Sequence, residues 1–383
     1  MKRNYIAKRF QNAGSGLTLD TEALAKYKDI IDLSIGDTDF ITDEGIINAA
    51  FRDAKAGYTR YGDPKGDPEL IDAVCRAWQE DFEQKLPHDH VLVSASSCLG
   101  MALVMFSILD PGDEVIVFSP YFPMYRTQIE LAGGVCVDVP TYASEDYAID
   151  EARLRAAITP RTKAIIFNNP TNPTGMAYGN DTLEMLAHVA KEYDLLIAAD
   201  EIYTTYLYEG DFRPLRTLPG MAERTITLNS FSKNFLMTGW RVGVIIAEPE
   251  LLEVMNDING SLIYTAPSIS QRAAIHALSM RREIREKYVT AYRDRIFYTA
   301  DRIEKIPYLS LVRPKGTFYL FPGIEKTGLT DDEFCNVLLD KAHVLVSHGK
   351  AFGTAGAGHF RIACTVGIDT LKIAFDRMEK LSF

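Results

Sequence analysis

The chain has 383 residues, of which 47% are hydrophobic and 24% charged, a composition typical of a globular protein with two or three domain-sized units. The formal net charge of −11 argues against nucleic acid as a partner, because neutralising phosphates requires a basic face. No apolar run reaches the roughly 18 residues that span a bilayer, so we expect no membrane contact either.

From Glu69 onward, short apolar runs alternate with amphipathic ones. Helices are predicted over residues 67–84, 99–109, 125–133, 151–158 and 181–193. Strands are predicted over residues 90–95, 113–119, 133–140, 163–169, 195–201, 225–230 and 241–247. Apolar strands that alternate with helices predict an α/β fold with a mostly parallel sheet covered by helices on both faces.

A smaller α+β unit is predicted at the C-terminal end. Residues 268–305 keep helical spacing without a clear stop, which predicts one long helix that connects the two units. The tail then has apolar runs at 309–314 and 316–321, a helix at 331–342, a strand at 359–366 and a helix at 368–380. We expect an N-terminal arm and part of the small domain in residues 1–44, a large domain in 45–280 and a small domain in 281–383.

Cysteines and histidines are sparse and scattered. The five cysteines include no CxxC pair, which predicts reduced thiols rather than disulfides or a zinc site. His88 and His90 form the one close histidine pair, on a polar link without helical ligand spacing, so no metal site is predicted. The segment MKRNYIAKRFQNAGSG is basic but lacks the apolar stretch of a signal peptide, and we expect a cytoplasmic protein.

Polar and aromatic residues follow five of the predicted strands, at the sheet edge where an open parallel sheet binds ligands. In chain order they are Ser96, Ser97 and Cys98, then Tyr121 and Phe122, Asn172, Asp200 and Tyr203, and finally Ser230 and Lys233 with Arg241 beyond. Each residue alone has an ordinary explanation, such as a helix cap or a surface ion pair. Five successive strand ends with complementary chemistry indicate a binding site.

Three segments carry a family resemblance: SFSKNFLMTGWRVG (230–243), NNPTNPTG (168–175) and AADEIY (198–203). They resemble the signature segments of the fold-type I pyridoxal-phosphate enzymes, class I/II aminotransferases. The similarity runs almost end to end, through IDLSIGDTDF (31–40), YGDPKGDPELIDAV (61–74), LDPGDEVIVFSPYFPMY (109–125), PKGTFYLFPGI (314–324) and HGKAFGTAGAGHFRIACTV (348–366).

The resemblance implies pyridoxal 5′-phosphate as the cofactor. Lys233 would be the lysine joined covalently to it and the base that moves the proton at the substrate α-carbon. Lysine suits both tasks, because its amine is mobile and can lose its proton, whereas arginine is always charged. Asp200 would keep the ring nitrogen protonated. Phe122 would stack on the ring, and Tyr203 and Asn172 would hydrogen-bond its phenolic oxygen.

The phosphate and the substrate carboxylate have implied partners as well. Ser230, Arg241 and the N–H groups of Ser97 and Cys98 would hold the phosphate, with Tyr61 reaching it from the neighbouring subunit of a homodimer. The substrate α-carboxylate would bind Arg361, helped by Asn172 and the backbone of Gly36. The partners implied are thus amino acids, 2-oxo acids and a second copy of the chain.

The implied reaction is a ping-pong transfer of the amino group of an L-amino acid to a 2-oxo acid. A C–S β-lyase on the same scaffold is the alternative, since fold alone does not fix the reaction. A dehydrogenase is disfavoured because the glycine cluster 353–358 leads into a strand instead of opening a helix. A cofactor-binding regulator is disfavoured because the roughly 40 residues before the first signature leave no room for a DNA-binding domain.

The sequence does not identify the amino-acid donor. One aspartate-specific branch of the family has a lysine where Cys98 stands, so a dedicated clamp for a side-chain carboxylate is not evident. We expect specificity to come from the partner subunit and from residues 10–17, Tyr121, Tyr125, Ile263 and Tyr264.

Overall fold

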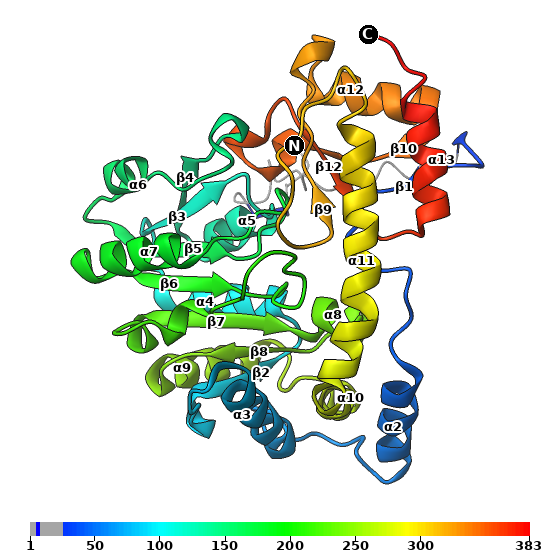
Figure 1. The fold of residues 1–383 in the computed structure, drawn as a ribbon. Helices are drawn as coiled ribbons and strands as arrows, with labels where there is room; N and C mark the ends of the chain where they lie inside the picture. The colour runs from blue at the N-terminus through cyan, green and yellow to red at the C-terminus, as the bar shows by residue number, and fades with distance from the viewer. Residues whose placement is uncertain (1–4, 8–25) are drawn as a thin grey trace.

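A computed structural model describes residues 5–7 and 26–383 (Figure 1). Its strands are β1 Ile31–Asp32, β2 Val91–Ser94, β3 Glu114–Ser119, β4 Val135–Pro140, β5 Thr162–Asn168, β6 Leu196–Asp200, β7 Thr225–Ser230, β8 Gly243–Ile246, β9 Tyr319–Leu320, β10 Val344–Leu345, β11 Ser347–His348 and β12 Phe360–Ala363. Its helices are α2 Glu44–Lys55, α3 Pro68–Phe82, α4 Ser97–Ile108, α5 Met124–Leu131, α6 Glu151–Ala157, α7 Asn180–Glu192, α8 Phe231–Asn234, α9 Pro249–Leu262, α10 Ser268–Ser279, α11 Arg281–Ile303, α12 Asp331–Val337 and α13 Ile368–Met378.

A seven-stranded sheet in the order β2-β8-β7-β6-β5-β3-β4 forms the centre of the larger region. Strand β8 runs antiparallel to β2 and β7, and the other neighbours are parallel, as predicted. Because β2 and β7 flank β8 and are both antiparallel to it, the carboxyl ends of β2, β3, β5, β6 and β7 point to the same sheet edge. The polar residues that follow these strands are thereby brought together.

Both faces of this sheet are buried, which explains why its strands are almost wholly apolar. In β5, Ala164 and Ile166 pack with residues of α4, α5 and α9, whereas Ile165 and Phe167 pack with residues of α6 and α7. Alternate side chains of a strand point to opposite faces. The fold is therefore an α/β sheet covered by helices on both sides, as the sequence indicated.

A smaller region carries a three-stranded antiparallel sheet in the order β11-β12-β9. Strand β1 pairs in parallel with β10, so residues 31–32 lie beside residues 344–345 despite the distance in sequence. Whether residues 1–44 form an arm and part of the small domain stays a prediction. The boundaries at residues 44 and 280 stay predictions.

The prediction of one long helix over residues 268–305 is wrong. Helix α10 ends at Ser279, Met280 leaves the helical conformation at φ −101° and ψ 7°, and α11 begins at Arg281 (Figure 1). The Ser279 hydroxyl bonds the carbonyl of His276 and competes with the helical ladder. Ion pairs from Arg281 to Glu80 and Asp81 of α3 then hold the start of α11.

The helix predicted over residues 331–342 also changes within its length. Helix α12 ends at Val337, and residues 338–342 continue as a π-helical turn. The run at 309–314 forms no strand beyond an isolated bridge from Ser310 to Gly323. Among the described residues, no helix combines the length and the apolar character that crossing a bilayer requires.

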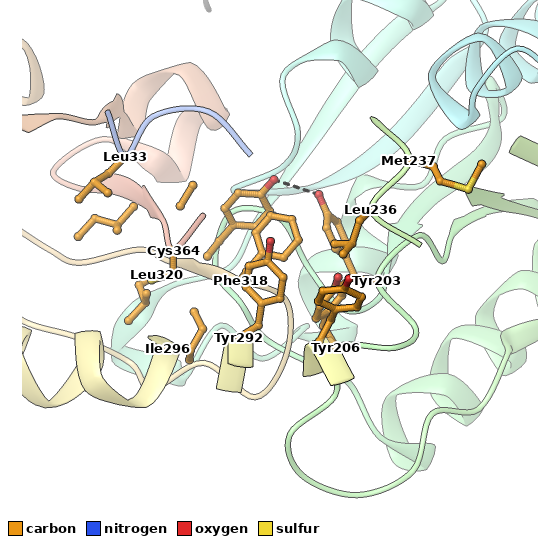
Figure 2. Close-up of a cluster of buried hydrophobic side chains, with 14 of the residues drawn as sticks. Leu33, Tyr203, Tyr206, Leu236, Met237, Tyr292, Ile296, Phe318, Leu320 and Cys364 are labelled. Carbon is orange, nitrogen blue, oxygen red and sulfur yellow. Dashed lines mark hydrogen bonds between the residues drawn. The ribbon is translucent and has the colours of Figure 1, made fainter. Parts of the chain in front are cut away.

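A cluster of buried aromatic rings joins the two regions (Figure 2). Tyr203 and Tyr206 follow β6, Tyr292 lies on α11, and Phe318 directly precedes β9. The ring of Phe318 lies 5.6 Å from that of Tyr203, 5.3 Å from that of Tyr206 and 5.1 Å from that of Tyr292, measured between centroids. Each edge-to-face or tilted pair of this kind contributes about 0.5–1.5 kcal/mol beyond its burial. The cluster fixes the small region against the edge of the large sheet.

Candidate active site

A cavity of about 560 Å³ lies where the edge of the large sheet meets the small region. The last residues of β5, β6 and β7 line it, as do residues of β10, β11 and β12. The predicted site residues that line it are Gly36, Ser97, Cys98, Phe122, Asn172, Asp200, Tyr203, Ser230, Lys233, Arg241 and Arg361. Residues that are far apart in the sequence are thus brought to one cavity, as the strand order requires.

Lys233 lies on α8, the short helix that follows β7. The Ser230 side chain starts this helix by accepting a hydrogen bond from the backbone N–H of Ser232 at 3.1 Å. The Lys233 ammonium donates to the carbonyl oxygen of Gly36 and lies 5.7 Å from the ring centroid of Phe318. The amine is therefore held inside the cavity by a backbone carbonyl and the face of an aromatic ring.

Asp200 is the last residue of β6 and is 7% exposed. Its Oδ2 accepts a hydrogen bond from the Tyr125 hydroxyl, while its Oδ1 is buried without a hydrogen-bond partner among the described residues. Burial raises the pKa of Asp200 to about 6, and the hydrogen bond from Tyr125 opposes this rise. A buried carboxylate with a free oxygen and no cation beside it is a site for a cationic or N–H group.

The N-terminus of α4 opens the cavity on another side. Ser96 caps this helix by accepting from the N–H of Leu99 at 3.3 Å, and its backbone has a φ of +101°, a strained value for a residue with a side chain. The N–H groups of Ser97 and Cys98 belong to the first turn and have no carbonyl one turn earlier to bond. Together with the helix dipole, such N–H groups bind anions.

Gly243 on β8 lets this helix end approach the sheet. A Cβ atom at position 243 would lie 2.7 Å from the backbone nitrogen of Ser97, which is too close for any side chain. Arg241, two residues earlier, lies in the left-handed region at φ +55° and donates to the Thr238 carbonyl at 2.7 Å. Its guanidinium lines the same cavity as Ser97 and Ser230. Hydroxyl, N–H and guanidinium groups therefore converge there.

Arg361 on β12 is 4% exposed and forms no ion pair with any residue that the structure describes. Its Nη1 donates to the Asn172 side-chain oxygen at 3.0 Å, and its Nη2 donates to the carbonyl oxygen of Ser34. The buried Nε atom has no hydrogen-bond partner among the described groups. Burial lowers the pKa of the Arg361 guanidinium, and the phenols of Tyr319 and Tyr203 oppose this. A guanidinium left in this state needs a carboxylate.

Two tyrosines have contacts at the site that sequence reasoning did not identify. Tyr125, expected only to influence specificity, bonds Asp200. Tyr319 on β9 lines the cavity, bonds the Tyr203 hydroxyl at 3.2 Å and lies with its ring centroid 4.5 Å from the Arg361 guanidinium. Tyr125 follows Phe122 by three residues and lies in the first turn of α5, so its closeness in sequence was a usable signal. Nothing in the spacing of the tail indicated Tyr319.

Some of the residues expected to set specificity lie elsewhere. Residues 10–17 fall outside the described residues. The Tyr121 hydroxyl donates to Asp138 at 3.1 Å, and Tyr121 does not line the cavity, so its part in specificity stays a prediction. Ile263 and Tyr264 do not line it either. Tyr61 is 82% exposed and packs edge-on against Tyr264 at 5.0 Å, outside the cavity of its own chain.

The residues present fit pyridoxal phosphate. The free Oδ1 of Asp200 fits a protonated ring nitrogen, and the anion-binding end of α4 with Arg241 fits a phosphate. Phe122 and Lys233 line the same cavity as these groups and Arg361.

Comparisons with known proteins agree with this chemistry. Residues 28–378 match the family model for class I and II aminotransferases. The aspartate aminotransferase of Pyrococcus abyssi is 36% identical, and the alignment covers 93% of this chain and 92% of that protein. The arginine–pyruvate transaminase of Pseudomonas aeruginosa is 34% identical, and the alignment covers 93% of this chain and 91% of that protein. The solved structure of Thermus thermophilus aspartate aminotransferase with maleate matches with a TM-score of 0.92 at 32% identity and covers 99% of this chain and 100% of its own.

These relatives give no support to the β-lyase alternative. They also share the pyridoxal 5′-phosphate cofactor that members of the family use. The chain belongs to the class I and II aminotransferases, the enzymes that move an amino group between an amino acid and a 2-oxo acid.

Proposed function

We propose that the cavity is the transamination site and that its two unpaired buried charges define where cofactor and substrate bind. The observation that carries the proposal is that Asp200 and Arg361, of opposite charge, line one cavity, and each keeps a buried polar atom without a partner among the described residues. Leaving a buried charge unpaired costs several kcal/mol. Asp200 would pair with the cofactor ring nitrogen, and Arg361 with the substrate α-carboxylate.

Pyridoxal phosphate supplies an aldehyde and an electron-withdrawing ring that stabilises negative charge at the substrate α-carbon. Asp200 would sustain this by keeping the ring nitrogen protonated, and the Tyr125 hydroxyl would hold the carboxylate in place. Ser97, Cys98, Ser230 and Arg241 would anchor the phosphate, and Phe122 would stack on the ring. Tyr203 and Asn172 would hydrogen-bond its phenolic oxygen.

Lys233 would carry the moving proton at its Nζ atom. Its hydrogen bond to the Gly36 carbonyl orients the side chain. As a neutral amine, Nζ would still have N–H groups to donate and would have a lone pair free to accept a proton. The flexible side chain would let Nζ take the proton from one atom of the reacting system and return it to another. The backbone of Gly36 and the Asn172 side chain would assist Arg361 in orienting the substrate.

The reaction would follow a ping-pong course, with the amino acid leaving as a 2-oxo acid before the second 2-oxo acid binds. We infer a homodimer in which Tyr61 reaches the phosphate of the neighbouring subunit, because its ring is largely exposed and does not line the cavity of its own chain.

The five cysteines are all free thiols, which agrees with a location in the cytoplasm, where the environment is reducing.

A visible absorption titration tests the proposal. Amino acids are added one at a time to the pyridoxal-phosphate-loaded protein, and the cofactor absorption band is recorded before and after 2-oxoglutarate is supplied. We expect at least one amino acid to remove the band and the oxo acid to restore it. Formation of pyruvate from cysteine without an oxo-acid acceptor, and no reversible loss of the band with any amino acid, would contradict transamination.

A further inference from the structure

Tyr319 is a buried phenol between the cofactor side and the substrate side of the cavity. It is 2% exposed on β9, and its ring lies under the Arg361 guanidinium, 4.5 Å from ring centroid to Cζ. Its hydroxyl oxygen lies 3.2 Å from that of Tyr203. A cation over an aromatic ring is a favourable arrangement. The ring of Tyr319 therefore contacts Arg361, while its hydroxyl contacts Tyr203.

The position of the Tyr319 hydroxyl is fixed from three directions. A Cβ atom at Gly36 would lie 1.8 Å from this oxygen, so only glycine permits the chain at residue 36 to close over it. The carbonyl of Gly36 accepts from Lys233. Edge-on packing against Tyr203, at 5.8 Å between centroids, and tilted packing against Phe318, at 4.8 Å, hold the ring. The hydroxyl therefore has little freedom to find another partner.

The hydrogen bond between the two phenols has a direction that depends on what else Tyr203 bonds. Each hydroxyl has one proton. In the structure, the Tyr203 hydroxyl donates to that of Tyr319. If Tyr203 instead donates its one proton to the phenolic oxygen of the cofactor, the hydrogen bond between the phenols reverses, and Tyr319 donates to Tyr203. A donor that itself accepts a hydrogen bond becomes a stronger donor, by about 10–30% per bond.

We propose that Tyr319 is a positioning residue that donates to Tyr203 and thereby strengthens the hydrogen bond from Tyr203 to the cofactor. The inference rests on the proposed function, in which Tyr203 bonds the cofactor. The phenols of Tyr125, Tyr206 and Tyr292 interact electrostatically with Tyr203 or Tyr319. The charged side chains near the two phenols are Arg361 on β12 and Asp200 on β6, together with Lys233 on α8, which lines the same cavity. All three are retained in the variants used below.

The test is the pH titration of the visible absorption of the pyridoxal-phosphate-loaded protein. A hydrogen bond to the phenolic oxygen stabilises its negative charge, which matters most after the lysine-linked nitrogen has lost its proton. Weakening that hydrogen bond therefore raises the pH at which half of the absorption change has occurred, which is the midpoint of the titration. We expect Tyr203→Phe to raise it by about one unit and Tyr319→Phe by about 0.3–0.5 units. The Michaelis constant for the amino acid should change less than about twofold in Tyr319→Phe, because the ring under Arg361 remains.

A double-mutant cycle shows whether Tyr319 acts through Tyr203. In the Tyr203→Phe background, Tyr319→Phe should produce no additional shift, since the residue through which it acts is gone. Tyr292→Phe is the matched control: it removes a buried phenol hydroxyl from the same aromatic cluster, but that hydroxyl bonds Thr38. Its midpoint should equal that of the parent.

The outcomes distinguish a failure of the role of Tyr319 from a failure of the proposed function. A parent protein that takes up no pyridoxal phosphate, or a Tyr203→Phe variant with an unshifted midpoint, would overturn both. A shift in Tyr203→Phe with none in Tyr319→Phe would overturn the role of Tyr319 alone. An equal shift from Tyr319→Phe with and without Tyr203 would also overturn it, because the hydroxyl would then act by another route.

Discussion

Asp200 and Arg361 are both buried in one cavity without a counter-ion among the described residues, but they come from different regions and differ in how their charge is held. Asp200 ends a strand of the large sheet and has a pKa of about 6, raised by burial. Arg361 lies in the small sheet, bonded to Asn172 and Ser34, and a guanidinium does not lose its proton at any pH the protein meets. The charge of Asp200, on the proposed cofactor side, is therefore sensitive to pH, and that of Arg361, on the proposed substrate side, is not.

Replacing the acidic member of this pair should have the largest effect. We expect Asp200→Asn to lower kcat about 10³-fold at pH 8, because an amide does not hold a proton on the ring nitrogen. Steady-state kinetics at saturating cofactor measure the change. Asp194→Asn, at an exposed aspartate paired with Arg224, is the control and should retain parental kcat. Parental kcat in Asp200→Asn would show that the cofactor does not depend on this carboxylate.

Replacing the basic member should act on substrate binding. We expect Arg361→Lys to lower kcat/KM about 100-fold, mainly through KM, because an ammonium does not bind a carboxylate through two parallel hydrogen bonds. The absorption spectrum of the bound cofactor should stay parental. Arg377→Lys, at an ion pair with Asp29 outside the cavity, is the control. A loss of cofactor binding with unchanged KM would show that Arg361 holds the cofactor and not the substrate.

The pH sensitivity of Asp200 should appear in the stability of the cofactor-free protein. The pKa of Asp200 is about 6 in the folded protein against an ordinary value of 3.8, so the folded state holds the proton more tightly. Its stabilising contribution is then complete below pH 3.8 and is lost as the pH rises through about 6. Between pH 4.5 and 7, the free energy of unfolding of the parent should fall by about 2 kcal/mol relative to Asp200→Asn, measured by urea unfolding. A constant difference would contradict the raised pKa.

The smallest effect is expected from the neighbouring subunit. In the proposed homodimer, Tyr61→Phe would delete one hydrogen bond to the phosphate of the neighbouring subunit. We therefore expect cofactor affinity to fall about 10-fold, with the protein dimeric by sedimentation. Tyr142→Phe, at another partly exposed tyrosine, serves as the control. Unchanged affinity, or a loaded protein that sediments as a monomer, would argue against a residue shared between subunits.

The contrast between the regions also explains what the sequence could predict. Asn168, Asp200 and Ser230 each end a strand, and the register pairs Asn168 with Asp200 directly, so strand order alone brings them to one edge. Apolar runs that alternate with helices made this order visible. The sheet and its polar edge were therefore predictable from the alternation of apolar strands and helices. The role expected of each site residue came from the resemblance to the family.

The small region gave no such signal. Arg361 bonds Asn172 across 189 residues of sequence, and Tyr319 bonds Tyr203 across 116, by contacts that no local periodicity encodes. The resemblance identified Arg361, and nothing identified Tyr319. The helix break at Met280 also depends on contacts that are distant in sequence, because ion pairs from Arg281 to α3 hold the start of α11. No glycine or proline marks the break in the sequence.

Lys233 should be the residue that reacts with the cofactor, and chemical trapping can identify the lysine that carries it. The pyridoxal-phosphate-loaded protein is reduced with sodium borohydride, digested and examined by peptide mass spectrometry, with Lys233→Ala treated in parallel. We expect the phosphopyridoxyl group on the peptide that contains Lys233, and no labelled peptide from the variant. A label on another lysine of the parent, or no label at all, would show that Lys233 does not react with the cofactor.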